Sequence, residues 1–250
     1  MKRTALGIAF ALTFLVAAQP ALAQTAEEIL DRSLAALGGR AAHAKITSRS
    51  TVGSITISTP AGEIVGSIEL WNVAPNKSRS VIRADLTALG AGQLVIDQRF
   101  NGETGYALDS LQGDREITGN QLDNLRNGAF PHPYMTYKEL GVKVSLDGKE
   151  SVDGKEAHVV LFTPARGSAS RQFIDAKTYL PLKVMTTINV PQIGGDMEQT
   201  IMFSDYRDVD GINVPYTIAS TSTIQNFSVS VAKIEHNVKV DEALFSKPAK

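Results

Sequence analysis

Cysteine is absent from the 250 residues of this chain. Without it the chain forms no disulfide and offers no thiol for a lipid anchor. Aromatic residues are also scarce, at 6% with one tryptophan, against 43% hydrophobic residues in all. The composition therefore indicates an interior rich in Val, Ile and Leu, and it excludes both a disulfide scaffold and an aromatic platform for sugars.

An excess of charge and long apolar runs are also missing. Lys and Arg number 25 against 26 Asp and Glu, a net charge of −1, and no basic cluster of the kind that binds nucleic acid occurs. After Ala18, no apolar stretch approaches the roughly 20 residues that cross a bilayer. We therefore expect no nucleic-acid partner and no transmembrane span in the mature chain, and any hydrophobic cargo must enter a folded pocket.

The amino-terminal segment has the pattern of an export signal. Lys2 and Arg3 precede the apolar run 5–18, and small residues at Ala21 and Ala23 suit signal peptidase. The pattern predicts a cleaved signal peptide over 1–23 and a mature protein in a bacterial periplasm. The remaining chain, 24–250, has a length that one mainly β domain often reaches, so we expect a single domain.

Two helices are predicted at opposite ends of the first half. Thr25 and Glu28 fit a capping box, and the residues after them follow helical spacing until Gly38-Gly39 supplies a stop. A second, short helix is predicted over Thr118–Asn127, ended by Gly128. Each helix has one apolar stripe, which indicates that it lies on a sheet.

Beyond Ile46 the hydrophobic period changes to two, with turns such as Asp153-Gly154 and Asp210-Gly211 between the runs. About eleven to twelve strands are expected, and strands with helices set apart from them favour an α+β, mainly β fold with an antiparallel sheet. Residues 64–71 carry apolar side chains on both faces, so the sheet is expected to need a cover on each side.

The segment from Phe130 to Tyr137 is dense in aromatic and proline residues, although it lies between predicted elements. Connecting segments are usually polar. This loop is therefore expected to dock on something apolar.

Recognisable catalytic chemistry is missing. His43, His132, His158 and His236 lie far apart in the sequence without metal-ligand spacing, and each is interpreted as an ordinary histidine. No G-x-S-x-G elbow, P-loop or dinucleotide fingerprint occurs. We therefore predict no catalytic residues, no metal, no cofactor and no enzymatic activity.

One strand and its turn resemble a known family. Residues 66–76, Gly-Ser-Ile-Glu-Leu-Trp-Asn-Val-Ala-Pro-Asn, resemble the G-x-x-x-L-W-x-x-x-P-N segment of the LolA-type lipoprotein carriers. Residues 101–106 and 240–248 are weaker matches, and 173–182 and 205–212 look like segments of the wider LolA-like, lipoprotein-sorting-type proteins.

The resemblance implies a half-open antiparallel barrel whose apolar concave face is covered by helices, with acyl chains held between them. One position departs from it. The carriers have an arginine immediately before the Pro-Asn pair that is credited with latching the lid, and this chain has Ala74 there. A pocket is therefore expected, whereas lipoprotein carriage does not follow from the motif.

The main hypothesis is a non-enzymatic carrier or sensor that binds a lipid, the acyl chains of a lipidated protein or another hydrophobic ligand in a half-barrel cavity. Exposing an acyl chain to water costs about 0.8 kcal/mol per CH₂, so such a carrier needs a dry groove. The candidate lining and lid residues are Ile68, Leu70, Trp71, Leu94, Ile96, Leu122, Leu125, Tyr134, Tyr137, Leu161, Val184, Ile188, Ile201 and Phe203.

Two alternatives stay open. In the first, the protein is an interaction module without a cavity, and the aromatic loop 130–137 docks on an envelope protein. In the second, it is a hydrolase whose residues meet only in the fold, built from His132 or His158 with a distant Asp.

Overall fold

The structure is a computed structural model, and it describes residues 24–248 apart from 61, 88–89, 129 and 191–194. The predicted signal peptide therefore lies outside the described residues. The helical elements are α1 (Ala26–Ala36), α2 (Gly39–His43), α3 (Gly119–Asn127) and the 3₁₀ turns η2 (Pro133–Met135) and η4 (Glu242–Phe245). The strands are β1 (Ser48–Thr59), β2 (Gly62–Val73), β3 (Lys77–Asp85), β4 (Gln93–Phe100), β5 (Gly105–Asp109), β6 (Arg115–Ile117), β7 (Lys143–Val152), β8 (Lys155–Thr163), β9 (Ser170–Asp175), β10 (Pro181–Val190), β11 (Gly195–Val209), β12 (Ile212–Ser222) and β13 (Asn226–His236).

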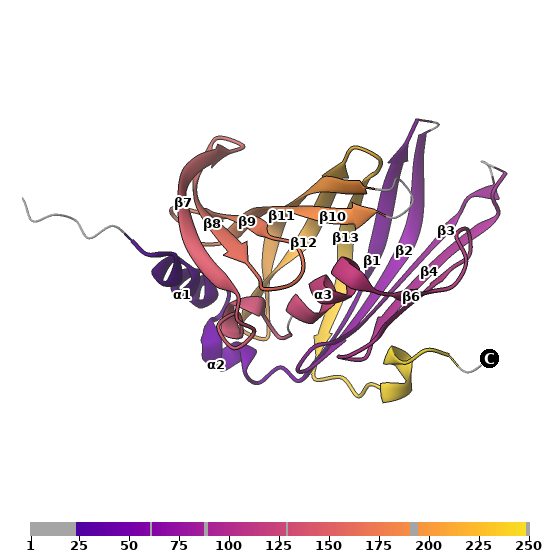
Figure 1. Cartoon of the computed structure of the whole chain (residues 1–250), viewed down its shortest axis with the longest axis horizontal. Helices are drawn as coiled ribbons and strands as arrows, with labels where there is room; N and C mark the ends of the chain where they lie inside the picture. Colours follow the sequence, from indigo (N-terminus) through magenta and orange to yellow (C-terminus); the bar gives the residue numbers. More distant parts are fainter. Residues whose placement is uncertain (1–23, 61, 88–89, 129, 191–194, 249–250) are drawn as a thin grey trace, which may run out of the picture.

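The strands of the described residues form one antiparallel sheet that does not close. Its 13 strands follow the order β6-β5-β4-β3-β2-β1-β13-β12-β11-β10-β9-β8-β7, so β6 and β7 are its two edges. The sheet curls into two arms, β1–β6 and β7–β12 (Figure 1). Residues 118–142 connect β6 to β7, which lie at opposite edges. This connection must therefore cross the open side of the half-barrel, and it carries α3 and η2.

The apolar stripe of α1 covers the concave face of the second arm, where α1 lies beside β7 to β9 in Figure 1. Its buried residues Ile29, Leu30 and Leu34 form one cluster with Tyr134, Tyr137, Val160, Phe162 and Ile174. Burying aliphatic side chains of this size contributes about 1.5–3 kcal/mol each. The amino-terminal helix is thus part of the core of this arm.

The concave face of the first arm is filled by side chains of the sheet itself, from this arm and from the adjacent β13. We call this set the packed cluster, and its buried members are Ile55, Ile57, Ile68, Ala84, Leu86, Leu94, Val229 and Val231. Strand registers place them on one face: Ile68 pairs with Ile82, which pairs with Ile96. Half-buried residues of β12 and β13, including Ile218 and Phe227, pack against the cluster.

Most of the predicted local signals are confirmed. Thr25 Oγ1 accepts the Glu28 amide N–H and the Glu28 carboxylate accepts the Thr25 amide N–H, each at 3.2 Å, which is the predicted capping box. The second predicted helix is α3. Asp153-Gly154 and Asp210-Gly211 both adopt positive φ at the hairpin ends, as a type I′ turn requires. Helix α2 was not predicted, because the chain turns at Gly38 (φ 114°) and then resumes helical geometry.

The expected cover on both faces is present over only part of the first arm. Val65 lies on the convex face, opposite to Ile68, and its side chain is 66% exposed. Trp71 shares this convex face, where the Arg79 guanidinium lies 5.4 Å from its ring centre and Arg79 also binds Asp97. At β3 and β4, in contrast, the segment with η4 covers this face: Arg99 donates to the Ser246 carbonyl, Lys77 binds Glu242, and Val81 is only 1% exposed. Among the described residues, no helix is long and apolar enough to cross a membrane.

Candidate functional site

Cavities lie between the concave face of the second arm and the connection 118–142, which spans the open side of the half-barrel and is called the crossing segment below. The larger one, the lid cavity, measures ≈ 430 Å³, and its walls include Tyr137, Phe162, Ile188 and Ile201. The second one, the inner cavity, measures ≈ 270 Å³. Both are within or close to the ~300–1,000 Å³ of small-molecule sites.

The two cavities are adjacent, and we call them together the groove. Pro133, Gln172 and Val184 line both of them. A third space of ≈ 400 Å³, the end cavity, continues from the lid cavity through the shared residues Asn124 and Ile188. The walls of the inner and lid cavities are mainly apolar. The groove therefore offers an elongated, largely hydrophobic space beneath α3 and η2.

Helix α3 leaves this space open because polar contacts at its two sides hold it. Asn124 accepts the Ser168 amide N–H at 2.7 Å, and Asn127 donates to the Arg166 carbonyl at 2.7 Å, both in the second arm. Arg126 donates to the Glu103 carbonyl at 3.0 Å in the first arm. No residue of α3 is buried. The helix therefore spans the open side of the half-barrel without filling the space below it.

The aromatic segment docks on apolar surface, as predicted. Tyr134 and Tyr137 are 3% and 7% exposed and pack against α1 and Phe162. The Tyr134 hydroxyl donates to the Gln172 Oε1 at 2.5 Å. Phe130 is also buried, and its amide N–H donates to the Pro75 carbonyl. These rings face the interior, so they do not form the exposed docking surface of the interaction-module alternative.

A polar cluster closes the inner end of the groove, where His43, Arg49 and His132 line the inner cavity. The rings of His43 and His132 lie 5.3 Å apart between centres. Burial, with smaller contributions from the neighbouring His43 and Arg49, lowers the pKa of His132 to about 3. Burial also lowers the pKa of His43, with a further contribution from Arg49. Both imidazoles are neutral at physiological pH.

Arg49 keeps its charge in these surroundings. Burial lowers the pKa of its guanidinium to about 10, which still leaves it protonated at pH 7. Its Nε donates to His236 Nε2 at 3.1 Å, and His236 Nδ1 contacts Asp210 at 3.0 Å. Because His236 Nε2 accepts this bond, its proton sits on Nδ1 and the ring is neutral. The guanidinium also lies 5.4 Å from the ring centre of Phe130.

Six of the residues predicted to contact ligand line the inner or lid cavity: Tyr134, Tyr137, Val184, Ile188, Ile201 and Phe203. Leu125 lines the end cavity, and Leu122 lines a smaller pocket beside Phe245. The structure thus brings the predicted residues of β10, β11 and the crossing segment to one groove.

The other predicted residues lie elsewhere. Ile68 and Leu94 are buried in the packed cluster, and Leu70 and Ile96 pack against it, so none of the four lines the three cavities. Leu161 points to the face opposite Val160 and Phe162, because successive strand residues alternate. Trp71 lies on the convex face beside Arg79, as described above.

The polar cluster was not predicted. The histidines were expected to be separate, yet His43, His132 and His236 gather around Arg49 from four different elements or loops. No short-range spacing marks them, because the partners are far apart in the chain. The hydrolase alternative named His132 and His158; among the described residues, neither makes a hydrogen bond to a carboxylate. His132 Nδ1 accepts the Tyr134 amide N–H instead.

No group of three or more His, Asp or Glu side chains within the described part of the chain is arranged to hold a metal ion.

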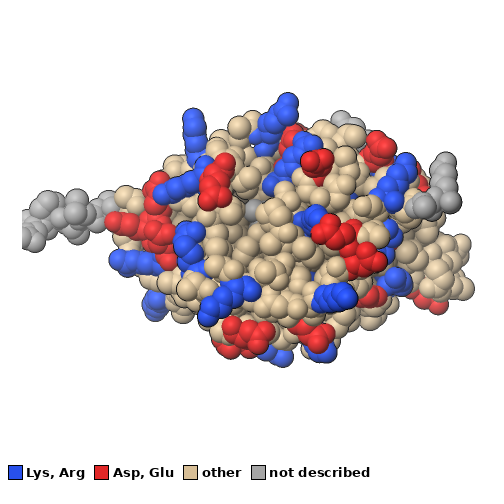
Figure 2. Space-filling view, turned by 90° about the horizontal axis from the view of Figure 1, so that it is seen from below, with Lys and Arg blue, Asp and Glu red and all other residues tan. Residues whose placement is uncertain are grey.

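Viewed from the side where α2 and η4 lie, the surface has an uncharged area surrounded by charged side chains of both signs (Figure 2). The fold and the groove together define a class: an open antiparallel half-barrel with a mostly apolar concave space under a crossing helix.

Comparison with solved structures places this architecture. A LolA superfamily protein from Nitrosomonas europaea matches with a TM-score of 0.55 and 15% identity over 90% of this chain and 99% of that one. An outer membrane lipoprotein-sorting protein domain from Vibrio parahaemolyticus matches at 0.56 and 12%, over 88% and 95%. A DUF1329 family protein from Desulfovibrio piger matches at 0.56 and 14%, over 88% and 97%.

The chain therefore has the LolA-like fold, which confirms at the level of architecture what the resemblance of residues 66–76 predicted. No protein-family model matches the sequence, and a search of curated proteins gives no significant match. At 12–15% identity these likenesses describe the fold alone.

Proposed function

We propose that this protein is a periplasmic, non-enzymatic carrier or sensor, folded as one domain after removal of residues 1–23, that binds a lipid or the acyl chains of a lipidated protein. The observation that carries the proposal is the pair of adjacent, mainly apolar cavities, the lid and inner cavities, which share the wall residues Pro133, Gln172 and Val184. Its walls are mainly apolar. Burial of an acyl chain there gains about 0.8 kcal/mol per CH₂.

The fold and the export signal support the same function. The match to a lipoprotein-sorting domain supports a role in handling lipidated cargo. An exported protein that handles apolar molecules must shield them from water, and the sequence pattern of 1–23 supports export. The buried Tyr134 and Tyr137 favour this function over the interaction module, because they contribute to a cavity wall instead of a docking surface.

The proposal is tested by filling the groove. Val184 lines both cavities, and Val184→Trp places an indole at their junction. N-phenyl-1-naphthylamine, a neutral probe that brightens in apolar sites, is titrated into delipidated protein. We expect the wild type to bind the probe and Val184→Trp to lose at least tenfold in affinity.

Val65→Trp is the matched control, because Val65 is exposed on the convex face. It is expected to bind the probe like the wild type. Mass spectrometry of a lipid extract from freshly purified wild-type protein provides an independent readout and is expected to reveal an amphiphile. Absence of both a co-purifying amphiphile and probe binding in the wild type would refute the proposed function.

A further inference from the structure

The inner cavity contains a cation without a counter-ion. Arg49 is the one charged side chain among the described residues that line it. Its Nη2 is buried and has no hydrogen-bond partner in the part of the chain that the structure describes. Its Nε binds the neutral His236, and the carboxylate of Asp210 lies beyond that ring, with its side chain 66% exposed. Among the described residues, no carboxylate therefore contacts the guanidinium.

A second polar side chain beside it lacks partners. His43 is 1% exposed and lines the same cavity, and neither ring nitrogen makes a hydrogen bond with another described residue. The Leu37 carbonyl, which accepts the Asn213 amide N–H at 3.1 Å, also lies near enough to the ring to raise its pKa as an acceptor, but this contact falls short of a hydrogen bond. A neutral imidazole keeps one N–H donor. The inner cavity thus combines a guanidinium N–H and an imidazole N–H, both unsatisfied.

Buried polar groups without partners are costly, typically about 1–3 kcal/mol each and more for a charged one. Replacement of such groups by apolar ones often leaves stability equal or higher. Their presence beside an apolar groove is explained when a ligand supplies the missing acceptor. The acceptor that satisfies a guanidinium best is a carboxylate or phosphate oxygen.

We propose that the inner cavity binds the oxyanion head of an amphiphile, a carboxylate or a phosphate, on Arg49 and His43, while its acyl chain runs through the lid cavity. The connection between the cavities at Gln172 and Val184 provides the path for the chain. This inference rests on the proposed function and adds to it the class of ligand and its orientation in the groove.

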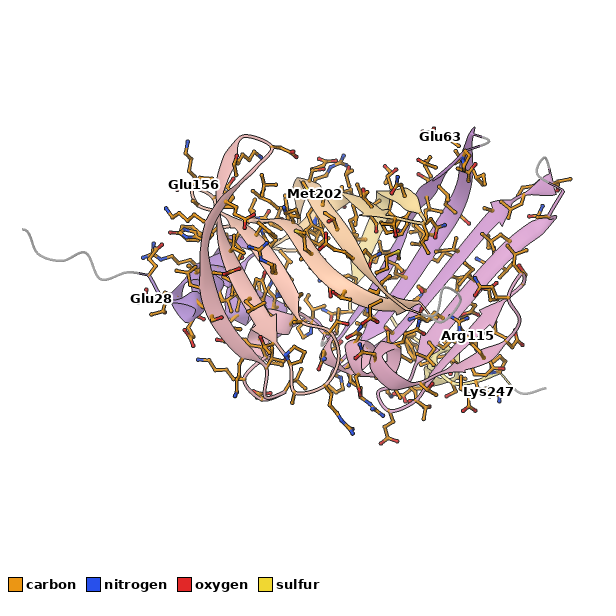
Figure 3. The ribbon with its side chains drawn as sticks, turned by 45° about the horizontal axis from the view of Figure 1, so that its top comes forward. Glu28, Glu63, Arg115, Glu156, Met202 and Lys247 are labelled. Carbon is orange, nitrogen blue, oxygen red and sulfur yellow. The ribbon has the colours of Figure 1, made fainter. Side chains whose placement is uncertain are left out.

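The opposite end of the groove offers a control. Arg115 lines the end cavity, and its Nη1 is also buried without a partner among the described residues. It lies in β6, toward the end of the molecule away from Glu28 of α1 (Figure 3). The inner cavity is favoured for the head group because a second unsatisfied donor, on His43, accompanies its arginine.

The test compares ligands that differ only in the head. Palmitate, 1-palmitoyl lysophosphatidic acid and neutral methyl palmitate each displace N-phenyl-1-naphthylamine from wild type, Arg49→Met and Arg115→Met. In the wild type we expect one or both anions to bind about tenfold or more tightly than the ester, as one charge-assisted hydrogen bond supplies. Whichever anion binds more tightly identifies the head as carboxylate or phosphate.

Arg49→Met is expected to abolish this preference, because it weakens binding of the anions far more than binding of methyl palmitate, whereas Arg115→Met keeps the preference. Because Arg49→Met removes a buried charge that has no counter-ion, the thermal midpoint of this variant is expected to equal or exceed that of the wild type. His43→Phe, which leaves Arg49 in place, is a second variant and should weaken the preference by several-fold.

Equal binding of anions and ester by the wild type overturns this inference while the proposed function stands. A preference that survives Arg49→Met, or that disappears in Arg115→Met, also overturns it. If neither the probe nor any of the three lipids binds, the proposed function fails as well. The two failures are therefore distinguishable.

Discussion

The two arms of the sheet present the same kind of concave face but fill it differently. In the first arm, Ile55, Ile68 and Leu94 pack against one another and against side chains of β12 and β13. In the second arm, Val184, Ile201 and Phe203 face a groove under the crossing segment. The difference comes from what each face meets: aliphatic side chains of neighbouring strands in one case, and in the other a helix with no buried residue that is held by polar contacts.

Apolar strand residues are therefore not by themselves a sign of a binding site. A well-packed core has few voids larger than a water molecule. A groove persists in the second arm because Asn124, Asn127 and Arg126 hold α3 by hydrogen bonds at its two sides. These bonds fix the helix at a distance that its own side chains do not fill.

The largest expected effect compares the same truncation in the two arms. Ile55→Ala removes a side chain that is 1% exposed in the packed cluster, and it should lower the free energy of unfolding by about 2–5 kcal/mol. Ile201→Ala removes a half-buried side chain that already borders a cavity, and roughly 1 kcal/mol is expected. Urea denaturation of both variants measures the difference, and equal losses would contradict the distinction between the arms.

A second prediction concerns acid sensitivity. Burial lowers the pKa of His132 from 6.5 to about 3. Between pH 6.5 and about 3, His132 therefore binds a proton in the unfolded chain but not in the folded chain. The contribution of His132 to stability is complete above pH 6.5 and decreases as the pH falls toward 3. Between pH 6 and 4 this amounts to roughly 2 kcal/mol.

His132→Asn keeps an acceptor for the Tyr134 amide N–H and removes the titration. The variant should lose less stability than the wild type on acidification, by that amount, in urea denaturation at several pH values. Wild-type and variant curves that fall in parallel would show that His132 is protonated in the fold at these pH values.

The smallest expected effect is local. Asn124→Ala combined with Asn127→Ala removes the three hydrogen bonds that these two residues of α3 make to residues 166–168, each worth about 1 kcal/mol. Amide hydrogen exchange of α3 should accelerate about tenfold or more, while exchange in β1–β4 stays unchanged. Equally faster exchange across both arms would mean that α3 stabilises the whole sheet, and not only the cavity beneath it.

Much of the fold follows from local sequence signals. Thr25 and Glu28 specify the start of α1, Gly128 ends α3, and Asp-Gly pairs specify hairpins, because each acts through neighbours in the chain. Alternation also assigns strand residues to one face or the other. The resemblance of residues 66–76 then supplied the open half-barrel, which the strand pattern alone did not specify.

The site was only partly predictable, because its chemistry depends on contacts between distant residues. Alternation placed Ile68 and Val184 on the concave face, but it does not reveal that one is buried in a solid cluster and the other borders a cavity. Leu122 and Leu125 have the spacing of a buried stripe and are nevertheless half-exposed. Tertiary packing alone brings together His43, Arg49 and His132, so no sequence motif indicates this cluster.

Xenon binding in crystals of delipidated protein tests the central difference between the two arms most directly, because this gas enters apolar cavities and not packed cores. The account predicts xenon beside Val184 in the groove and none among Ile55, Ile68 and Leu94 of the packed cluster. Xenon absent from the groove, or present equally in both arms, would contradict it.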